Sequence, residues 1–258
     1  MQIPTASERP GMPALQHYSP EEWKVRVALA ACYRLAAYFK MTDLIYTHFT
    51  ARVPGPEHHF LINPYGLMFH EVTASSLVKI DLEGKVVEDS PATINEAGYF
   101  IHSAVHRARE DAKCVLHTHT QAGVAVSAQK GGLLPISQFA LFYHNRIAYH
   151  DYAGLALDSS ECETLARDLG EKNIMILRNH GLLTCGETVA AAFSRMLNVD
   201  KACRVQISAQ AGGELNFPPE EVCEHTARQF DRFSGREVEI EWPALLRLVA
   251  EQEADYTR

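Results

Sequence analysis

The sequence predicts one α/β domain built around a mostly antiparallel sheet, and three features support this prediction. Ser-Pro-Glu-Glu, from Ser19 to Glu22, combines a helix N-cap, a proline at the first helical position and a glutamate placed to complete a capping box. Two runs rich in β-forming residues, LIYTHFTARV and HFLINPYGLMFHEV, flank a Pro-Gly-Pro turn and are typical of paired strands. The alanine-rich segment from Glu187 to about Gln210 predicts a major helix.

The remaining segments follow in order. Residues 1–18 contain Pro4, Pro10 and Pro13 and predict a flexible N-terminal arm, so that residues 19–258 form one domain with a helical C-terminal tail. We expect helices at 20–40, at 73–76 onward, 95–109 and 122–129, and a hairpin at 78–88 that turns at Glu83-Gly84; further strands at 113–120, 136–142, 146–152 and 173–186; and two tail helices at 220–233 and 243–256.

Composition excludes several classes of protein. The net charge of −8, with scattered basic residues, argues against a nucleic-acid partner, because no basic cluster exists to replace phosphate counterions. No segment approaches the roughly 20 apolar residues of a membrane span, and no signal peptide begins the chain. The six cysteines are widely spaced and predict buried, reduced thiols. We therefore expect a cytoplasmic protein that acts on a small molecule.

Histidines supply the main candidate site. His117-Thr118-His119 ends an apolar run, and alternate residues of a strand point to the same face, so both imidazoles can reach one ion. His180 lies in Asn-His-Gly after another apolar run, where Gly181 allows a sharp turn. Three imidazoles suit zinc, manganese, iron or nickel. Taken alone, His117 and His119 could also be two polar residues at the end of a strand. His180 alone could be a hydrogen-bonded histidine of the core.

The motifs INPYGLMFHEVTASSLVKID, AGYFIHSAVHRAREDAKCVLHTHT and RNHGLLTCGETVAAAF resemble the class II aldolase/adducin family, roughly from Glu21 to Gly213. The resemblance implies a three-layer α/β/α fold, usually assembled as a tetramer. It also implies that His117, His119 and His180 bind a divalent ion. Zinc is the first expectation, with manganese or iron as alternatives. The ion would act as a Lewis acid that stabilises an enediolate during cleavage of a carbon–carbon bond.

The chain departs from the aldolases of this family at two places. Their catalytic glutamate matches Gly98, and Glu96 lies two residues earlier, about 200° around a helix. Their phosphate-binding asparagine matches His48, and their paired serines match Glu96-Ala97. An acidic residue there would repel a phosphate dianion, so we expect an unphosphorylated substrate. The motif INEAG places the chain nearer to the adducin-like branch of the family.

These comparisons define candidate site residues. We assign Glu96, His48 and Tyr143 as catalytic residues and Asn63, Gly66 and His102 as substrate-binding residues. His70 and His144 are further candidates for acid–base work, while His102 and His106, four apart on one helix face, equally fit hydrogen-bonded residues inside the domain.

The leading hypothesis is a metal-dependent carbon–carbon lyase, of aldolase or decarboxylase type, for an unphosphorylated 2-oxo or hydroxy compound or an aromatic carboxylated compound. One alternative is an iron-dependent oxygenase on the same fold. The other is an adducin-like interaction module without catalytic activity, because the resemblance includes the adducin head domain. Retention of all three histidines weighs weakly against that module.

Overall fold

The computed structural model describes residues 18–154, 159–252 and 254–258. Its centre is a seven-stranded sheet with the strand order β3-β2-β1-β4-β7-β6-β5. Every neighbouring pair is antiparallel except β5 and β6, which the helix α5 connects in parallel. The strands are β1 (His48–Arg52), β2 (Phe60–Ile62), β3 (Val78–Ile80), β4 (Cys114–Thr118), β5 (Ile147–His150), β6 (Ile174–Leu177) and β7 (Gly181–Gly186).

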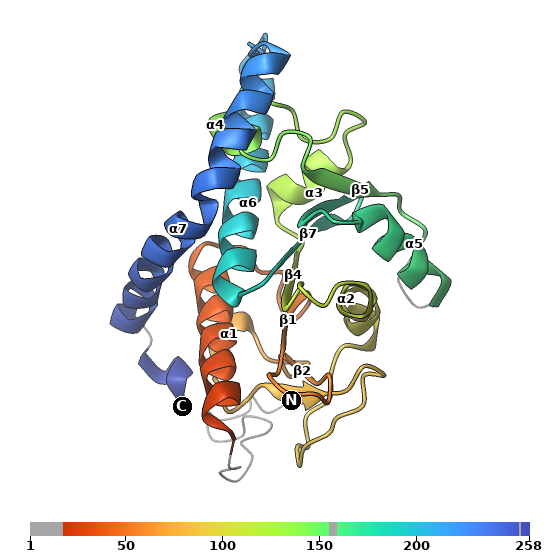
Figure 1. Cartoon of the computed structure of the whole chain (residues 1–258), viewed down its shortest axis with the longest axis vertical. Helices are drawn as coiled ribbons and strands as arrows, with labels where there is room; N and C mark the ends of the chain where they lie inside the picture. The colour runs from red at the N-terminus through yellow and green to blue at the C-terminus, as the bar shows by residue number, and fades with distance from the viewer. Residues whose placement is uncertain (1–17, 155–158, 253) are drawn as a thin grey trace, which may run out of the picture.

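Helices cover both faces of the sheet (Figure 1), which gives the expected three layers. α1, α6 and α7 lie on one side, and α2 and α5 lie on the other. The α-helices are α1 (Pro20–Tyr38), α2 (Glu96–Ala108), α3 (Gln121–Ser127), α4 (Gln138–Leu141), α5 (Ser159–Leu169), α6 (Val189–Ala211) and α7 (Glu220–Gln252), and 3-10 turns lie at Phe69–Glu71 and Ala254–Thr257.

Successive side chains of each strand point to opposite faces of the sheet, so the hydrophobic core has one part on each face. In β4, Leu116 packs with α1 and α6, whereas Val115 packs in the cluster that includes Val105 of α2. β1 is different, because its α2 face carries polar residues. Phe49 and Ala51 enter the α1 core, whereas His48 and Thr50 lie on the opposite face.

α1 begins as its sequence predicts. The Ser19 hydroxyl accepts a hydrogen bond from the Glu22 amide at 3.1 Å, and Pro20 occupies the first helical position. Tyr18, which the sequence assigned to the flexible arm, stacks on Trp23 with ring centroids 5.6 Å apart. The rest of the predicted arm lies outside the described residues.

Five expected elements were wrong in kind or extent. The segment 136–142 contains the short helix α4 (Gln138–Leu141) instead of a strand, because the Ser137 hydroxyl accepts a hydrogen bond from the amide of Ala140. Residues 73–76 form a turn rather than a helix. Residues 173–186 form two strands joined by a turn at 178–180, and the two tail helices are one helix, α7, with Pro243 inside it. Among the described residues, no helix is long and apolar enough to cross a membrane.

Candidate metal centre

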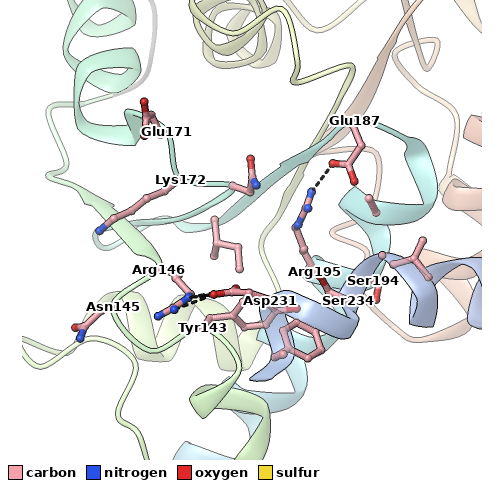
Figure 2. A pocket seen from close by; sticks show the side chains of 16 residues that line it. Tyr143, Asn145, Arg146, Glu171, Lys172, Glu187, Ser194, Arg195, Asp231 and Ser234 are labelled. Carbon is pink, nitrogen blue, oxygen red and sulfur yellow. Dashed lines mark hydrogen bonds and ion pairs between the residues drawn. The ribbon is translucent and has the colours of Figure 1, made fainter. Parts of the chain in front are cut away.

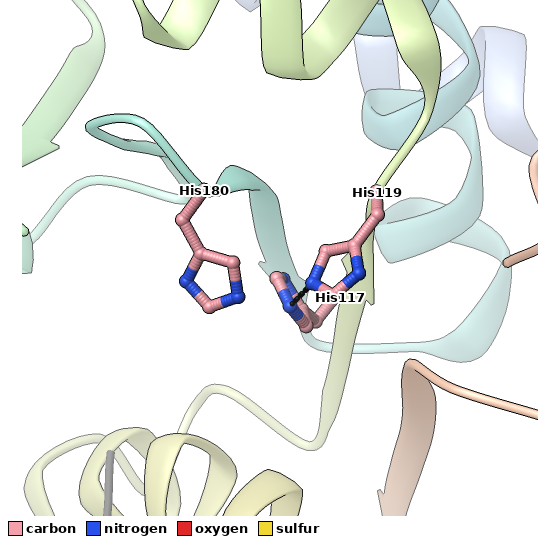
Figure 3. Close-up of side chains that lie close together, drawn as sticks. All are labelled: His117, His119 and His180. Carbon is pink, nitrogen blue, oxygen red and sulfur yellow. Dashed lines mark hydrogen bonds between the residues drawn. The ribbon is translucent and has the colours of Figure 1, made fainter. Parts of the chain in front are cut away.

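Three histidines meet at the edge where β4 ends and β6 turns into β7 (Figure 3). His117 lies in β4, His119 follows its last residue, and His180 lies in the turn before β7. One ring nitrogen from each of these side chains lies within 4.8 Å of the others. In the described part of the chain, this arrangement fits a cation held by three imidazoles.

The turn that carries His180 depends on its neighbours. Asn179 has a left-handed backbone with φ of +57°, which asparagine tolerates better than most residues. A Cβ on Gly181 would lie only 2.4 Å from the carbonyl oxygen of Thr118. Glycine therefore lets the β6–β7 turn pack closely against the end of β4, which brings His180 to the other two histidines.

Hydrogen bonds decide which nitrogen of each β4 histidine carries a proton. His117 Nδ1 lies 3.0 Å from the carbonyl oxygen of Leu182, and His119 Nδ1 lies 2.9 Å from a carboxylate oxygen of Asp43. Because both partners only accept, both Nδ1 atoms donate. In the neutral rings, each Nε2 is therefore an unprotonated lone pair.

Those two Nε2 atoms face each other at 2.8 Å. Two lone pairs at this distance repel unless a proton or a metal cation lies between them, so the geometry fits a bound metal ion. Burial lowers the pKa of His117 well below its usual value and lowers that of His180 to about 4. These two rings are therefore neutral near pH 7 and available as ligands.

The histidines line a cavity of about 650 Å³. Its wall includes the aromatic side chains of Tyr46, Tyr65 and Tyr152, and the described lining residues include no lysine or arginine. The lining therefore offers hydroxyl groups, ring faces and neutral imidazoles, but no side-chain cation to hold a phosphate dianion.

His48 lies in this cavity beside the histidines. It pairs with His117 across β1 and β4, and its ring is stacked at a tilt on His102, with centroids 4.1 Å apart. A Cβ on Gly98 would lie 2.2 Å from His48 Cε1, so the imidazole fills the space that any other side chain at position 98 would enter. Burial lowers the pKa of His48 to about 3.

The other candidates are distributed over the molecule. Tyr143 lines a separate pocket, beside the Arg146–Asp231 ion pair (Figure 2). His144 pairs with Glu220 at 2.7 Å, and His70 lines a third pocket. The structure does not bring these three residues to the metal centre, because α4 and the Phe69–Glu71 turn carry them elsewhere.

Asn63, Gly66 and His102 are not among the residues that line the cavity. Asn63 is buried, and its Oδ1 lies 2.8 Å from the Tyr33 hydroxyl. Gly66 has a φ of +101° and follows Tyr65, which does line the cavity. His102 is fully buried behind His48. Glu96 begins α2, but its side chain lies outside the described part of the structure.

Sequence reasoning missed several residues at this site. Asp43, Tyr46 and Tyr152 lie outside the family motifs, and Tyr65 lies within one but has no feature that singles it out, so only their meeting at the cavity marks these residues. Thr47, next to His48, has a φ of +64°, which is unusual for a β-branched residue and is typical of strain near functional sites.

The fold and the trio of histidines define a domain of the class II aldolase type. Residues 27–207 match the family model described as Class II Aldolase and Adducin N-terminal domain, and the chain belongs to this family. A crystal structure of an aldolase II superfamily protein from Pseudomonas syringae has a TM-score of 0.91 and 54% identity, and the match covers 94% of this chain and 98% of that one.

Two further relatives represent both branches of the family. L-fuculose 1-phosphate aldolase from Glaciozyma antarctica PI12 has a TM-score of 0.81 and 27% identity, over 95% of this chain and 96% of that one. Rat (Rattus norvegicus) alpha-adducin is 48% identical over 205 residues, which are 78% of this chain and 28% of adducin. Family and fold therefore agree with the sequence predictions.

Proposed function

We propose that this protein is a divalent-metal-dependent carbon–carbon lyase for an unphosphorylated 2-oxo or hydroxy compound or an aromatic carboxylated compound. Membership of the class II aldolase family supports an aldolase-type lyase. One observation best supports a bound metal. The Nδ1 atoms of His117 and His119 both donate hydrogen bonds, which leaves their Nε2 atoms, 2.8 Å apart, available as ligands. His117, His119 and His180 would hold the ion, with zinc as the first choice and manganese or iron as alternatives.

The metal would polarise the carbonyl or carboxylate oxygen of the substrate and stabilise the negative charge that develops there. During cleavage, neutral His48 would take the proton of the substrate hydroxyl, which becomes a carbonyl as the carbon–carbon bond breaks. The electron pair of that bond passes to the 2-oxo fragment. His48 would then deliver the same proton to the new carbanionic carbon and become neutral again.

His48 is proposed for this role because it reaches the cavity from β1, beside His117. It occupies the space at Gly98, where the aldolases of this family have their glutamate. Glu96 remains a second catalytic candidate from the sequence. The proposal for Tyr143 has no support from its position, because Tyr143 lines a different pocket.

The cavity supports an unphosphorylated substrate. A phosphate dianion would find no lysine or arginine among the described lining residues, and Asp43 adds negative charge. Tyr46, Tyr65 and Tyr152 offer ring faces and hydroxyl groups that suit an aromatic or hydroxylated compound.

Metal analysis tests the proposal. Protein purified without chelator should contain about one zinc, manganese or iron ion per chain, and His117→Ala should lose it. His225→Ala is the matched control, because His225 is an exposed histidine on α7. A wild-type protein that binds none of these ions when they are supplied in excess would disprove the metal-dependent function.

Two alternatives have distinct results. An iron-dependent oxygenase would consume oxygen after addition of ferrous iron, whereas the lyase would not. The similarity to rat alpha-adducin favours, as the second candidate, an interaction module without catalytic activity. A module of this kind would tolerate His117→Ala with no loss of partner binding.

We also propose a cytoplasmic homotetramer, for which the six free cysteines and the exposed apolar residues of α7 give support. Phe233 and Ile240 are 55% and 66% exposed, which is unusual for large apolar side chains on a monomer. Light scattering after size exclusion should give about four times the chain mass of 28.8 kDa. A monomer at micromolar concentration would contradict this prediction.

A further inference from the structure

A chain of buried hydrogen bonds runs between β1 and α2, behind His48. Thr50 Oγ1 lies 2.7 Å from His102 Nδ1 and 2.8 Å from His106 Nε2. His106 Nδ1 lies 3.0 Å from the carbonyl oxygen of Ala112. The three side chains are at most 3% exposed, so water has little access to their hydrogen bonds.

The Ala112 carbonyl fixes the direction of every bond in this chain. A carbonyl only accepts, so His106 Nδ1 carries the proton and, in the neutral ring, Nε2 accepts. The Thr50 hydroxyl must then donate its single proton to His106 and accept from His102 Nδ1. Neutral His102 consequently has a protonated Nδ1 and an unprotonated Nε2.

Burial keeps both rings neutral. It lowers the pKa of His106 to about 3 and that of His102 well below its usual value. The proton positions above therefore hold near neutral pH. They follow from contacts among Thr50, His102, His106 and Ala112, none of which lines the cavity.

This chain of hydrogen bonds ends at two rings, His102 and His48, that have ring nitrogens without a hydrogen-bond partner in the described part of the structure. His102 Nε2 and both ring nitrogens of His48 are buried and have no hydrogen-bond partner among the described residues, although the nearby Gly98 backbone raises the pKa of His48 against the larger lowering by burial. The two rings are already in contact, with centroids 4.1 Å apart. A buried acceptor without a partner is costly, and the N–H of His48 is the complementary group beside it.

We propose that Thr50, His102 and His106 are positioning residues that orient His48 for proton transfer. In the reacting protein, a turn of the His48 ring brings its N–H to His102 Nε2, and the other nitrogen of His48 then faces the cavity as a lone pair. Ala112 thus sets, through three side chains, which nitrogen of His48 can take a proton from a substrate. This inference rests on the proposed function of His48, but the proton positions on His102 and His106 can be tested without it.

Two substitutions distinguish the effect of the Thr50 hydroxyl from the effect of its side-chain volume. Thr50→Val keeps the volume and removes the hydroxyl, whereas Thr50→Ser keeps the hydroxyl. Thr184→Val is the matched control, because Thr184 is a fully buried threonine of the same sheet whose hydroxyl donates to the Ala192 carbonyl. If Thr50→Val does not fold, Thr50→Ala takes its place.

Nitrogen-15 NMR of the chelator-treated protein at pH 7.5 reports the protonated ring nitrogen directly. We expect His102 and His106 with protonated Nδ1 in the wild type, in Thr50→Ser and in Thr184→Val. In Thr50→Val, His102 should shift toward the form with protonated Nε2, while His106 stays unchanged. A wild-type His102 with protonated Nε2 would overturn the inference.

Deuterium exchange into the methyl group of pyruvate, with zinc-loaded protein, tests the consequence for His48. Thr50→Val should slow the maximal exchange rate by about 10-fold or more with little change in half-saturation, as for other residues that orient a reacting group, and Thr50→Ser should restore it. Equal exchange in Thr50→Val and wild type would refute the positioning role. If the wild type binds zinc but catalyses no exchange, the function of His48 fails, and the NMR result still decides the proton positions.

Discussion

Asp43 shows how one carboxylate can determine the chemistry of a histidine ligand. Its oxygen accepts from His119 Nδ1 at 2.9 Å and thereby leaves Nε2 free for a metal ion. Because Asp43 lies in a loop with no recognisable motif, its role becomes visible only through this contact.

Asp43→Asn should weaken metal binding by about 10- to 100-fold, because the amide holds His119 Nδ1–H less strongly than the carboxylate does. Titration against a zinc-binding dye measures the change. Asp168→Asn is the control, since Asp168 makes a similar bond to His150 Nδ1 at 2.8 Å outside the cavity lining. Equal zinc affinity in the two variants would contradict this role of Asp43.

Gly98→Ala should displace His48, because the new Cβ would lie 2.2 Å from the imidazole. We expect a loss of about 1–3 kcal/mol in the free energy of unfolding, despite the better helix propensity of alanine. Zinc content should stay unchanged while pyruvate exchange falls.

Gly235→Ala is the matched control for that substitution. Gly235 lies in α7, and a Cβ there would contact nothing within 4 Å. The control should stabilise the protein by up to about 1 kcal/mol. Urea denaturation compares the two, and equal stability changes would show that position 98 has room for a side chain.

At the scale of elements, α1 is tied to the edge of the sheet by Arg26. This fully buried arginine pairs with Glu22 and Glu88 at 2.9 and 2.7 Å and donates to the carbonyl of Leu77. Lys79 of β3 adds a contact to Glu22. The network ties the helix to Leu77 and Glu88, which lie 51 and 62 positions away along the chain.

Arg26→Met should lower the free energy of unfolding by about 3–5 kcal/mol, because it leaves two buried carboxylates without their main partner. Arg247→Met is the control, since Arg247 is exposed on α7 and donates to one carbonyl of its own helix. Thermal denaturation gives both values. A loss below about 1 kcal/mol for Arg26→Met would contradict this role.

At the scale of the whole molecule, burial keeps several histidines neutral. The pKa values of His48 and His106 fall to about 3, and that of His180 to about 4, with desolvation as the main cause in each case. In the unfolded chain the same groups take up protons near pH 6.5. The unfolded state therefore binds more protons between about pH 6.5 and 3.

The metal-free protein should consequently lose stability as the pH falls below about 6.5, at up to about 1.4 kcal/mol per pH unit for each such histidine. Above this range neither state is protonated, so the effect vanishes. Urea denaturation with chelator at pH 7.5, 6.5 and 5.5 measures it. Constant stability from pH 7.5 to 5.5 would show that these rings are not held neutral by the fold.

The sequence by itself determined the local elements and the family. Ser19 and Pro20 start α1 through contacts within one turn, and the motifs around His117 and His180 identify the class II aldolase/adducin fold. The prediction of a strand at 136–142 failed because a single side-chain cap outweighed β-propensity over a short run.

Only the tertiary structure decided the chemistry around the histidines. Three contacts show this. His48 fills the space at Gly98, 50 positions away, and Thr50 bonds to His102, 52 positions away. Asp43 accepts from His119, 76 positions away. Periodicity and capping report near neighbours along the chain. The state of a ring nitrogen depends on which distant carbonyl, carboxylate or hydroxyl the fold brings to it.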